Sequence, residues 1–255
     1  MDKISLLIPC RNEQGTISTA IELGKRLPGV DEIIVIEGNS SDDTFQTALR
    51  ASNEFRDSVS FEIKVIKQSK IGKWNAIQEG IPFAKNSNLA IWDADLTVSF
   101  SEQCLIHERF LANYEHLGKF CLVTGNRMAL REAGAMRVLN LLGNSLFSKL
   151  WSFLSGIYIP DLLCGSKVFS KKILGSLPST LMDKDPYGDF TIFASAIVSG
   201  QKIEFQNLTY RARSYGQTNI LRWSGGLSLL NFTLSFFLKH KSIIKSLKNQ
   251  SVMAK

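Results

Sequence analysis

Short apolar runs alternate with longer helical stretches through the first 95 residues. The apolar runs span 4–9, 31–37, 61–66 and 89–95, and the helical stretches between them span 14–27, 42–55 and 73–84. Strands separated by helices indicate βαβ units and a parallel sheet whose strands are buried on both faces. Because such sheets bind ligands beyond the carboxyl ends of their strands, we expect functional residues directly after these runs.

The rest of the chain continues the α/β pattern. We expect a strand at 120–126, a long helix from 133 to about 156, a strand at 164–169, a helix near 188–199, strands near 202–213 and an amphipathic segment from about 225 to 247. No linker rich in proline, glycine or serine separates these elements. The sequence therefore predicts one α/β domain over 1–222, followed by a basic amphipathic segment, 223–255, packed on that domain or on a membrane surface.

Cysteine usage and hydropathy indicate a cytoplasmic protein. The four cysteines are scattered and form no CxxC pair, so reduced thiols are expected rather than disulfides or a metal site. The N-terminal apolar stretch is too short for a signal peptide. The apolar run at 226–238 carries several polar residues and is too short to span a bilayer. We therefore expect a cytoplasmic protein, with association to the cytoplasmic face of a membrane as an alternative.

The net charge of +7 is concentrated at the C-terminal end. No acidic residue follows Glu204, whereas eight basic residues do, and the first 204 positions have a net charge of −1. This asymmetry indicates an anionic or phosphate-bearing partner near the C-terminus. A nucleic-acid partner is not expected, because its recognition would need basic and aromatic residues interleaved on one face, and here the lysines follow the aromatic residues.

Two aspartates, Asp93 and Asp95, follow the apolar run that begins at residue 89. Unpaired buried charge is costly, and two carboxylates this close repel each other unless a cation lies beside them. Mg²⁺ and Mn²⁺ are commonly held by one or two carboxylates while substrate phosphates and water complete the coordination. The pair therefore predicts a divalent metal site for a diphosphate ligand. The alternative is that Asp95 caps the next helix and Asp93 faces solvent.

Six motifs in order make the chain resemble family 2 glycosyltransferases. These are IPCRNE, IVIEGNSSDDT, KIGKWNAIQEGI (70–81), WDADL, IPDLLCGSKVFSKKIL (159–174) and YRARSYGQTNI (210–220). The last two resemble segments of the dolichyl- or polyprenyl-phosphate sugar transferases, and the likeness covers about residues 3 to 222. The resemblance implies a GT-A fold, which is a Rossmann-like, mostly parallel sheet flanked by helices. It also implies a nucleotide-sugar donor, UDP- or GDP-linked, and transfer with inversion at the anomeric carbon.

The resemblance also assigns roles to residues after the first strands. Pro9, Arg11 and Glu13 would line the nucleotide pocket, Glu37 would contact the base or ribose, Lys73 would lie beside the base, Asp93 would reach the ribose or metal, and Asp95 would bind the metal against the diphosphate. The sequence departs from the family at two positions. Gly38 replaces the second acidic residue after Glu37, and Thr97 stands where lipid-phosphate members often have a glutamine.

Two kinds of acceptor are compatible with the sequence. A hydroxyl acceptor needs a general base, for which Asp189 is the candidate, although Asp189 could instead be a helix N-cap. A phosphate acceptor is already ionised and needs cations. The candidate cations are Arg127, Arg137, Arg211 and Arg213, which could also be solvated surface charges. The arginine segment resembles its counterpart in the family more closely than Asp189 resembles a general-base motif. A polyprenyl phosphate is therefore favoured over a saccharide or other hydroxyl acceptor.

Asp161 has two possible roles, which are to orient an arginine or to make a turn.

The C-terminal segment combines apolar residues with lysines. Its apolar residues include Leu229, Leu230, Phe232, Phe236, Phe237 and Leu238, and lysines follow at 239, 241, 245 and 248. This pattern is typical of an interfacial helix on anionic lipid, or of a helix packed on the core or on a second subunit of a homodimer. A non-catalytic sugar-nucleotide-binding protein is the rival function, but it would not need Asp93 and Asp95.

Overall fold

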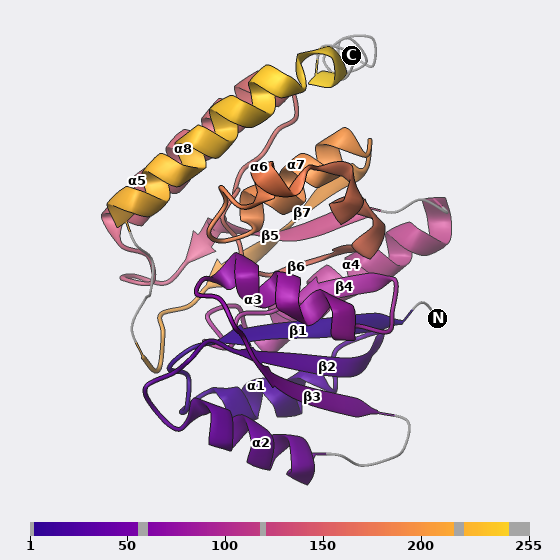
Figure 1. The fold of residues 1–255 in the computed structure, drawn as a ribbon, viewed down its shortest axis with the longest axis vertical. Helices are drawn as coiled ribbons and strands as arrows, with labels where there is room; N and C mark the ends of the chain where they lie inside the picture. Colours follow the sequence, from indigo (N-terminus) through magenta and orange to yellow (C-terminus); the bar gives the residue numbers. More distant parts are fainter. Residues whose placement is uncertain (1–2, 56–60, 118–120, 217–221, 245–255) are drawn as a thin grey trace.

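A seven-stranded sheet with helices on both faces forms the centre of the molecule (Figure 1). The structure is a computed structural model and describes residues 3–55, 61–117, 121–216 and 222–244. The strand order is β3-β2-β1-β4-β6-β5-β7, and every pairing except the two made by β6 is parallel. The predicted fold class, a mostly parallel GT-A-like sheet flanked by helices, is confirmed.

The N-terminal half forms where the alternation predicts it. Its elements are β1 (Ile4–Cys10), α1 (Ile17–Gly24), β2 (Val30–Glu37), α2 (Thr44–Glu54), β3 (Glu62–Lys67), α3 (Lys73–Gly80), a 3-10 turn (Ile81–Phe83) and β4 (Asn88–Ile91). The strand predicted over 89–95 was too long at its carboxyl end. The chain leaves the sheet after Ile91, so Asp93 and Asp95 lie in the loop that follows β4.

The second half contains a long helix over 100–117 and two short helical segments over 171–182 that the sequence analysis did not predict. Its elements are α4 (Phe100–Leu117), β5 (Cys121–Arg131), α5 (Val138–Ser155), β6 (Lys167–Ser170), a 3-10 helix (Lys171–Ser176), α6 (Ser179–Met182), α7 (Asp189–Val198), β7 (Lys202–Tyr210) and α8 (Arg222–Lys239). A capping box opens α4, since the Glu102 carboxylate accepts hydrogen bonds from the backbone amide and hydroxyl of Ser99. This motif also excludes the alternative in which Asp95 caps the helix.

Strand β6 runs against its neighbours. It is antiparallel to both β4 and β5, and it joins the N-terminal half of the sheet to the C-terminal half. Only one strand forms where strands were expected over 202–213, and it pairs in parallel with β5. The insertion of β6 brings the segment before it, including Gly165, beside the loop that carries Asp93.

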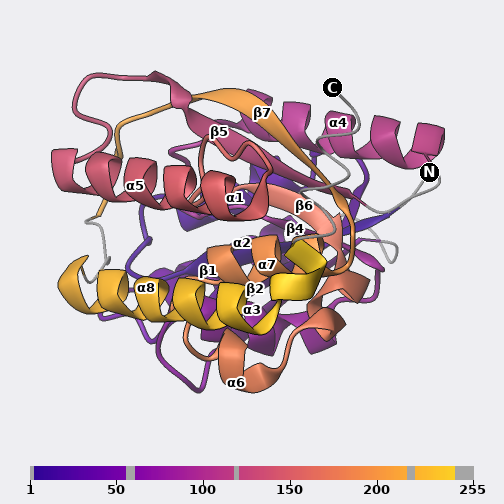
Figure 2. The ribbon, with the colours of Figure 1, turned by 90° about the horizontal axis from the view of Figure 1, so that it is seen from above.

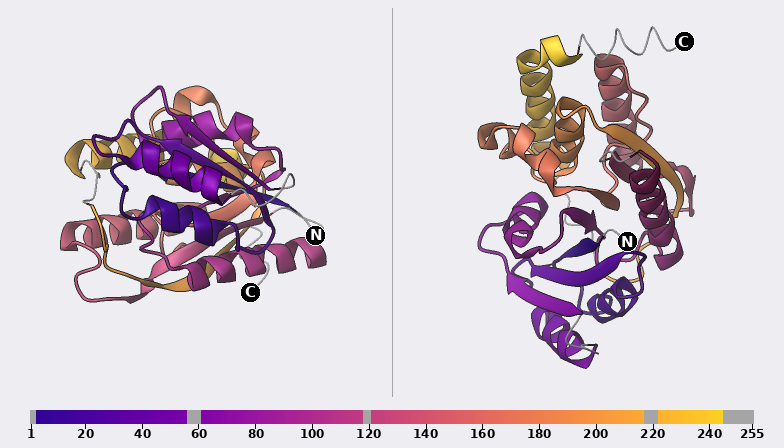
Figure 3. Two further views of the ribbon diagram at one scale, coloured as in Figure 1. Left: turned by 90° about the horizontal axis from the view of Figure 1, so that it is seen from below. Right: turned by 90° about the vertical axis from the view of Figure 1, so that its right-hand side faces the viewer.

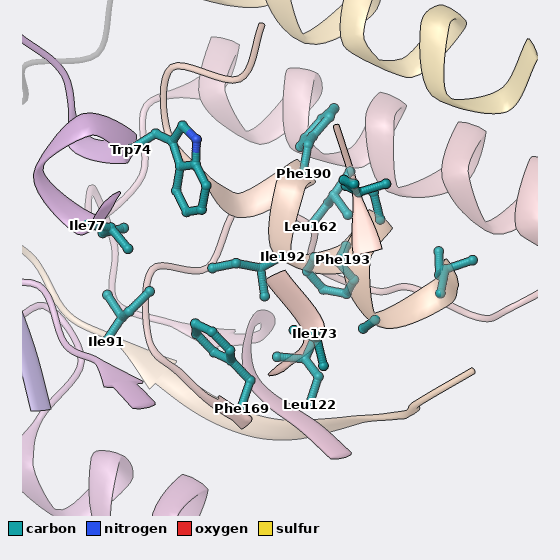
Figure 4. Close-up of a cluster of buried hydrophobic side chains, with 14 of the residues drawn as sticks. Trp74, Ile77, Ile91, Leu122, Leu162, Phe169, Ile173, Phe190, Ile192 and Phe193 are labelled. Atoms are coloured by element: carbon teal, nitrogen blue, oxygen red, sulfur yellow. The ribbon is translucent and has the colours of Figure 1, made fainter. Parts of the chain in front are cut away.

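Both faces of the sheet are covered by apolar side chains. Along β1, Leu7 packs into one cluster and its neighbours Leu6 and Ile8 into the other. Figure 4 shows the first cluster, in which Trp74 from α3 and Phe190 from α7 lie on the other side of the cluster from Phe169 of β6. This burial on both faces is the reason why the strands read as continuous apolar runs.

Helices α5 and α8 form an outer layer. They lie side by side beyond α6 and α7 (Figures 1 and 2), and in the second view of Figure 3 both extend away from the sheet. Trp151 of α5 joins them. Its ring stacks on Phe236 of α8 with centroids 5.4 Å apart, and its Nε1 donates a hydrogen bond to Thr233 Oγ1 at 3.0 Å. Within the described ranges, none of the helices is long and apolar enough to cross a bilayer.

Candidate functional site

The loops that follow β1 and β2 interlock at the carboxyl edge of the sheet. The amide of Asn12 donates to Ser40 Oγ at 2.9 Å, and the amide of Ser41 donates to Asn12 Oδ1 at 2.8 Å. The amide of Glu13 donates to Thr44 Oγ1 at 2.8 Å. These bonds fix the two loops as one unit beside the loop after β4.

A pocket of about 280 Å³ opens beside β2. It is lined by Glu37, Asn39, Ser40, Asp42, Asp43, Phe45, Gln46 and Lys67. Glu37 is buried, and its Oε1 accepts a hydrogen bond from the amide of Ser40 at 2.5 Å. Pro9, Arg11 and Glu13 lie on the adjoining β1 strand and loop, with the Arg11 side chain exposed.

Gly38, the departure from the family pattern after Glu37, lies close to the β1 loop. A Cβ atom at Gly38 would lie 3.2 Å from both Arg11 Cβ and the carbonyl oxygen of Cys10. A second acidic side chain at this position would therefore be crowded by the β1 loop.

Asp93 forms an ion pair with Lys73, the first residue of α3. Lys73 Nζ lies 2.5 Å from Asp93 Oδ1, and both side chains are partly exposed. Burial alone would raise the pKa of Asp93, but the attraction of Lys73 and its hydrogen bond outweigh burial and lower this pKa. A methyl group on Gly165 would overlap the Asp93 carboxylate, so only glycine allows this approach. Lys73, which the resemblance assigned to a position beside the base, therefore contacts the candidate metal ligand Asp93.

Arg213 joins the loops after β1 and β4. Its Nη1 donates to Glu13 Oε1 at 2.8 Å and its Nη2 donates to Asp95 Oδ2 at 2.6 Å. The other oxygen of Asp95 accepts bonds from the amide and the hydroxyl of Thr97. Burial opposes the charge of Arg213, but Asp95 and Glu13 outweigh it and raise the pKa of the guanidinium. Arg213, which the sequence analysis assigned to the acceptor phosphate, therefore contacts Asp95, a candidate metal ligand.

The carboxylate oxygens of Asp93 and Asp95 are suitable ligands for a divalent cation. Among the residues that the structure describes, no cluster of three histidine, cysteine or carboxylate side chains forms a complete metal cage. Two neighbouring carboxylates suit a hard ion that takes its other ligands from phosphate oxygens and water. Here each carboxylate is paired with a cationic side chain, Lys73 or Arg213.

Asp189 begins α7 and pairs with Lys167. The Lys167 side chain is fully buried on β6, and its ammonium contacts the Asp189 carboxylate. The N-cap residue of α7 is Gly188, so the alternative that Asp189 is an N-cap is wrong. Nearby, burial and the charge of Asp189 raise the pKa of Asp185 to about 6. Lys167 was missed from sequence, although a lysine within an apolar strand signals a buried charge that needs a partner.

Arg127 is held by Asp161 in a two-pronged ion pair. Arg127 Nε donates to Asp161 Oδ2 at 2.8 Å and Nη2 donates to Oδ1 at 2.9 Å. Asn144 of α5 also donates to Oδ1, at 2.8 Å. Asp161 is fully buried, so of its two predicted roles the structure shows that of orienting an arginine. The Tyr210 ring centroid lies 5.2 Å from the guanidinium carbon.

The four candidate arginines do not form one cluster. Arg127 contacts Asp161, and Arg213 contacts Glu13 and Asp95. Arg137 is exposed at the N-cap of α5, and Arg211 is exposed next to the site, where its amide donates to the carbonyl of Thr97 at 2.9 Å. Residues 217–221 of the motif that carries Arg211 and Arg213 lie outside the described residues.

Comparisons with known proteins agree with this geometry. The sequence profile of glycosyl transferase family 2 matches residues 5–131, the segment that carries the loops after β1, β2 and β4. The chain belongs to glycosyltransferase family 2. The matched segment contains the first four of the six motifs. The motifs at 159–174 and 210–220 lie beyond it, and the resemblance to the polyprenyl-phosphate subgroup stays a prediction.

Two curated relatives carry related names. Glycosyltransferase AglJ of Haloferax volcanii is 27% identical over 172 residues, which cover 67% of this chain and 51% of the relative. Glucosyl-3-phosphoglycerate synthase of Petrotoga mobilis is 28% identical and covers 69% of this chain and 56% of the relative. This family 2 chain therefore spans about half the length of the curated relatives it matches.

Solved structures support the fold. Glucosyl-3-phosphoglycerate synthase from Mycobacterium tuberculosis, in complex with Mn²⁺, UDP and phosphoglyceric acid, superposes with a TM-score of 0.64. It is 19% identical, and the match covers 92% of this chain and 78% of that one. The same enzyme with Mg²⁺ and UDP gives a TM-score of 0.64 at 20% identity, covering 92% and 79%.

The Asp161–Arg127 pair gives a prediction for stability. Asp161→Asn should lower the free energy of unfolding at neutral pH by about 3–5 kcal/mol, because it leaves a buried guanidinium unpaired. Although burial acts to raise the pKa of Asp161, Arg127 lowers it below the usual 3.8. The stabilisation is therefore present above that value and is lost as pH falls through the lower folded-state pKa. Urea unfolding at several pH values measures both effects.

The matched control for this prediction is Asp183→Asn, which alters an exposed aspartate. It should change the free energy of unfolding by no more than about 0.5 kcal/mol at any pH. If Asp161→Asn behaves like this control, or if its deficit stays constant down to acid pH, the ion pair does not stabilise the fold.

Proposed function

We propose that this family 2 glycosyltransferase moves a sugar from a nucleoside-diphosphate sugar to a polyprenyl phosphate, with inversion at the anomeric carbon. The observation that carries the proposal is the arrangement of Asp93 and Asp95, each paired with a cation, beside the interlocked loops after β1 and β2. The domain over 1–222 would hold the donor. The pocket lined by Glu37 and Lys67 would take the base and ribose, and Pro9 and Arg11 would flank the nucleotide.

The donor diphosphate would lie between the carboxylates and the cations of the site. We assign Asp93 and Asp95 as the residues that would hold Mg²⁺ or Mn²⁺, and the complexes of the Mycobacterium synthase with Mn²⁺ or Mg²⁺ and UDP support this assignment. A divalent cation supplies neutralisation of the charge that develops on the leaving diphosphate. Lys73 and Arg213 contact the two aspartates, and in the proposed complex both cations would bind diphosphate oxygens.

The state of Asp189 favours a phosphate acceptor. The Asp189 carboxylate already contacts the buried Lys167 ammonium, so an acceptor hydroxyl would have to compete with that ion pair for the same carboxylate. An acceptor phosphate oxygen is already ionised and attacks the anomeric carbon without losing a proton. Its charge would be met by arginines, with Arg211 exposed at the site and Arg127 oriented by Asp161. Arg137 stays a candidate on the exposed start of α5.

A second acceptor class is a phosphate-bearing molecule that reacts through a hydroxyl. It is favoured by the relatives named glucosyl-3-phosphoglycerate synthase. In that case the arginines would bind the acceptor's phosphate, and Asp189 would act as the general base. The two acceptor classes need the same donor site. They differ in whether Asp189 must act as a general base.

The metal assignment predicts a loss of donor binding in Asp95→Asn. The neutral amide should leave the fold intact but weaken Mn²⁺-dependent binding of the donor by at least about tenfold, because one charged ligand to the ion is lost. Calorimetric titration of UDP- and GDP-sugars, with and without Mn²⁺, measures the effect. Asp183→Asn is the control with an equal change of charge. Equal affinities for mutant and wild type, together with no effect of EDTA, would contradict the metal assignment.

The acceptor assignment predicts opposite behaviour for Arg211 and Asp189. Arg211→Ala should raise the acceptor KM by about 10–100-fold through loss of a charged hydrogen bond and leave donor affinity unchanged. Asp189→Asn is best combined with Lys167→Met, which removes the ammonium that the first change leaves unpaired. This double variant should keep most of its turnover on a polyprenyl phosphate.

Steady-state kinetics on both acceptor classes decides between the routes, with Arg50→Ala on α2 as a control for an exposed arginine. A hydroxyl acceptor predicts that the Asp189→Asn double variant loses about 10²–10⁴-fold in turnover. That loss beside a near-normal Arg211→Ala would overturn the phosphate route.

A further inference from the structure

Helix α5 buries Trp151 together with three polar residues and exposes a row of large apolar side chains on its opposite side. The buried residues of the helix are Asn144, Ser148, Trp151 and Ser155. The large apolar side chains on the opposite side are exposed, namely Val138 (69%), Leu139 (55%), Leu142 (60%), Leu146 (66%) and Phe153 (76%). A surface helix of a globular domain normally has the reverse arrangement. The outward apolar stripe is therefore not explained by packing of this domain.

The inward polar side of α5 has a clear structural use. Asn144 donates to Asp161 Oδ1 at 2.8 Å, and the amide of Leu162 donates to Ser148 Oγ at 3.1 Å. The amide of Ile159 donates to Ser152 Oγ at 2.9 Å. The helix therefore holds the loop that orients Arg127. These hydrogen bonds fix the position of α5 on the domain, and they thereby fix the positions of its exposed leucines.

Helix α8 adds a second apolar stripe beside the first. Its inner side packs Leu229, Phe232 and Phe236 into the core. Its outer side exposes Leu227 (70%), Leu230 (41%), Leu234 (54%) and Leu238 (63%). The two helices form the outermost layer in Figures 1 and 2. We call the exposed apolar residues of both helices the α5–α8 face. A face of this extent on adjacent helices marks an interaction surface.

The charges on the two helices are all basic. Neither helix contains an aspartate or glutamate, and no acidic residue follows Glu204. Lys149 on α5, Lys239 on α8 and Lys241 just beyond α8 are exposed. Lys245, Lys248 and Lys255 lie outside the described residues. Two copies of this face would bring like charges together, whereas a layer of anionic lipid headgroups complements them.

We propose that the α5–α8 face docks on an anionic membrane surface, with both helices lying in the plane of the interface. The sequence assigned membrane contact to 223–255 alone, and the structure adds α5 as an equal contributor. This inference extends the proposed function by placing the enzyme where a lipid-linked acceptor resides. Since Asn144 links α5 to Asp161, the docked helix and Arg127 belong to one hydrogen-bonded unit.

Vesicle co-sedimentation of the 255-residue chain tests the proposal without donor or acceptor, so its outcome is independent of transferase activity. The probes are phosphatidylcholine vesicles with and without phosphatidylglycerol. Wild type should bind the anionic vesicles, and binding should weaken as ionic strength rises. Leu142→Gln with Leu146→Gln should lower the partition coefficient by at least about tenfold. Lys149→Gln with Lys239→Gln should lower binding to anionic vesicles only.

The control is Leu105→Gln, which alters an exposed leucine on α4 outside this face and should bind like wild type. Thermal melting should show all these variants folded, because each change is at an exposed position. Leu234→Gln with Leu238→Gln gives an independent pair on α8 with the same expected loss. Equal vesicle binding by wild type and both leucine pairs overturns the proposal. A wild-type dimer in light scattering that the leucine pairs convert to monomer, with no vesicle binding, also overturns it and assigns the face to a second copy.

Discussion

The pairing of carboxylates with cationic side chains at the carboxyl edge of the sheet is the interaction on which the site depends. Glu13 lies after β1, Asp93 and Asp95 lie in the loop after β4, and Asp161 precedes β6. Each of these four carboxylates contacts a lysine or arginine. Removing such groups from water is costly, and the cost is offset only when good geometry and further hydrogen bonds satisfy every oxygen. The observed geometry meets this condition at Asp161 and Asp95, where both carboxylate oxygens accept hydrogen bonds.

The same pairs join parts of the chain that are far apart in sequence. Arg213 follows β7 and reaches Glu13 after β1, and Lys167 on β6 reaches Asp189 at the start of α7. Around the site, carboxylates and cationic side chains lie in contact with each other. In the proposed complex, the metal ion would bind the carboxylates and the diphosphate would bind the lysine and arginine, so that new ion pairs replace the present ones. Apolar contacts could not exchange partners in this way. The proposed function therefore accounts for charged contacts between the N-terminal and C-terminal halves of the chain.

Much of the N-terminal half could be predicted from sequence because strands buried on both faces produce unmistakable apolar runs. The candidate metal ligands Asp93 and Asp95 followed from the same logic, since charges directly after such a run need a reason. The helix at α4 was missed, although Ser99 and Glu102 signal its start. By contrast, nothing local in the sequence places Arg213 on Asp95 or makes β6 antiparallel, because both depend on how the second half folds back on the first.

The outward leucines of α5 show a related limit. The spacing of apolar residues predicts a helix but does not say which side is buried. Here the buried side combines Trp151 with Asn144 and two serines, while several leucines are exposed. The division between a domain over 1–222 and a segment over 223–255 stays a prediction, although α8 itself packs Phe236 against Trp151.

We propose that Asp93 and Asp95 would hold the cation that meets the donor diphosphate, and that Arg213 would then exchange its contact with Asp95 for diphosphate oxygens. Anomalous diffraction from crystals grown with Mn²⁺ and UDP measures this directly. We expect a manganese peak at the Asp95 carboxylate and beside the diphosphate, with the Arg213 Nη2 contact to Asp95 released. A nucleotide bound with the Arg213–Asp95 bond intact and manganese elsewhere would contradict it.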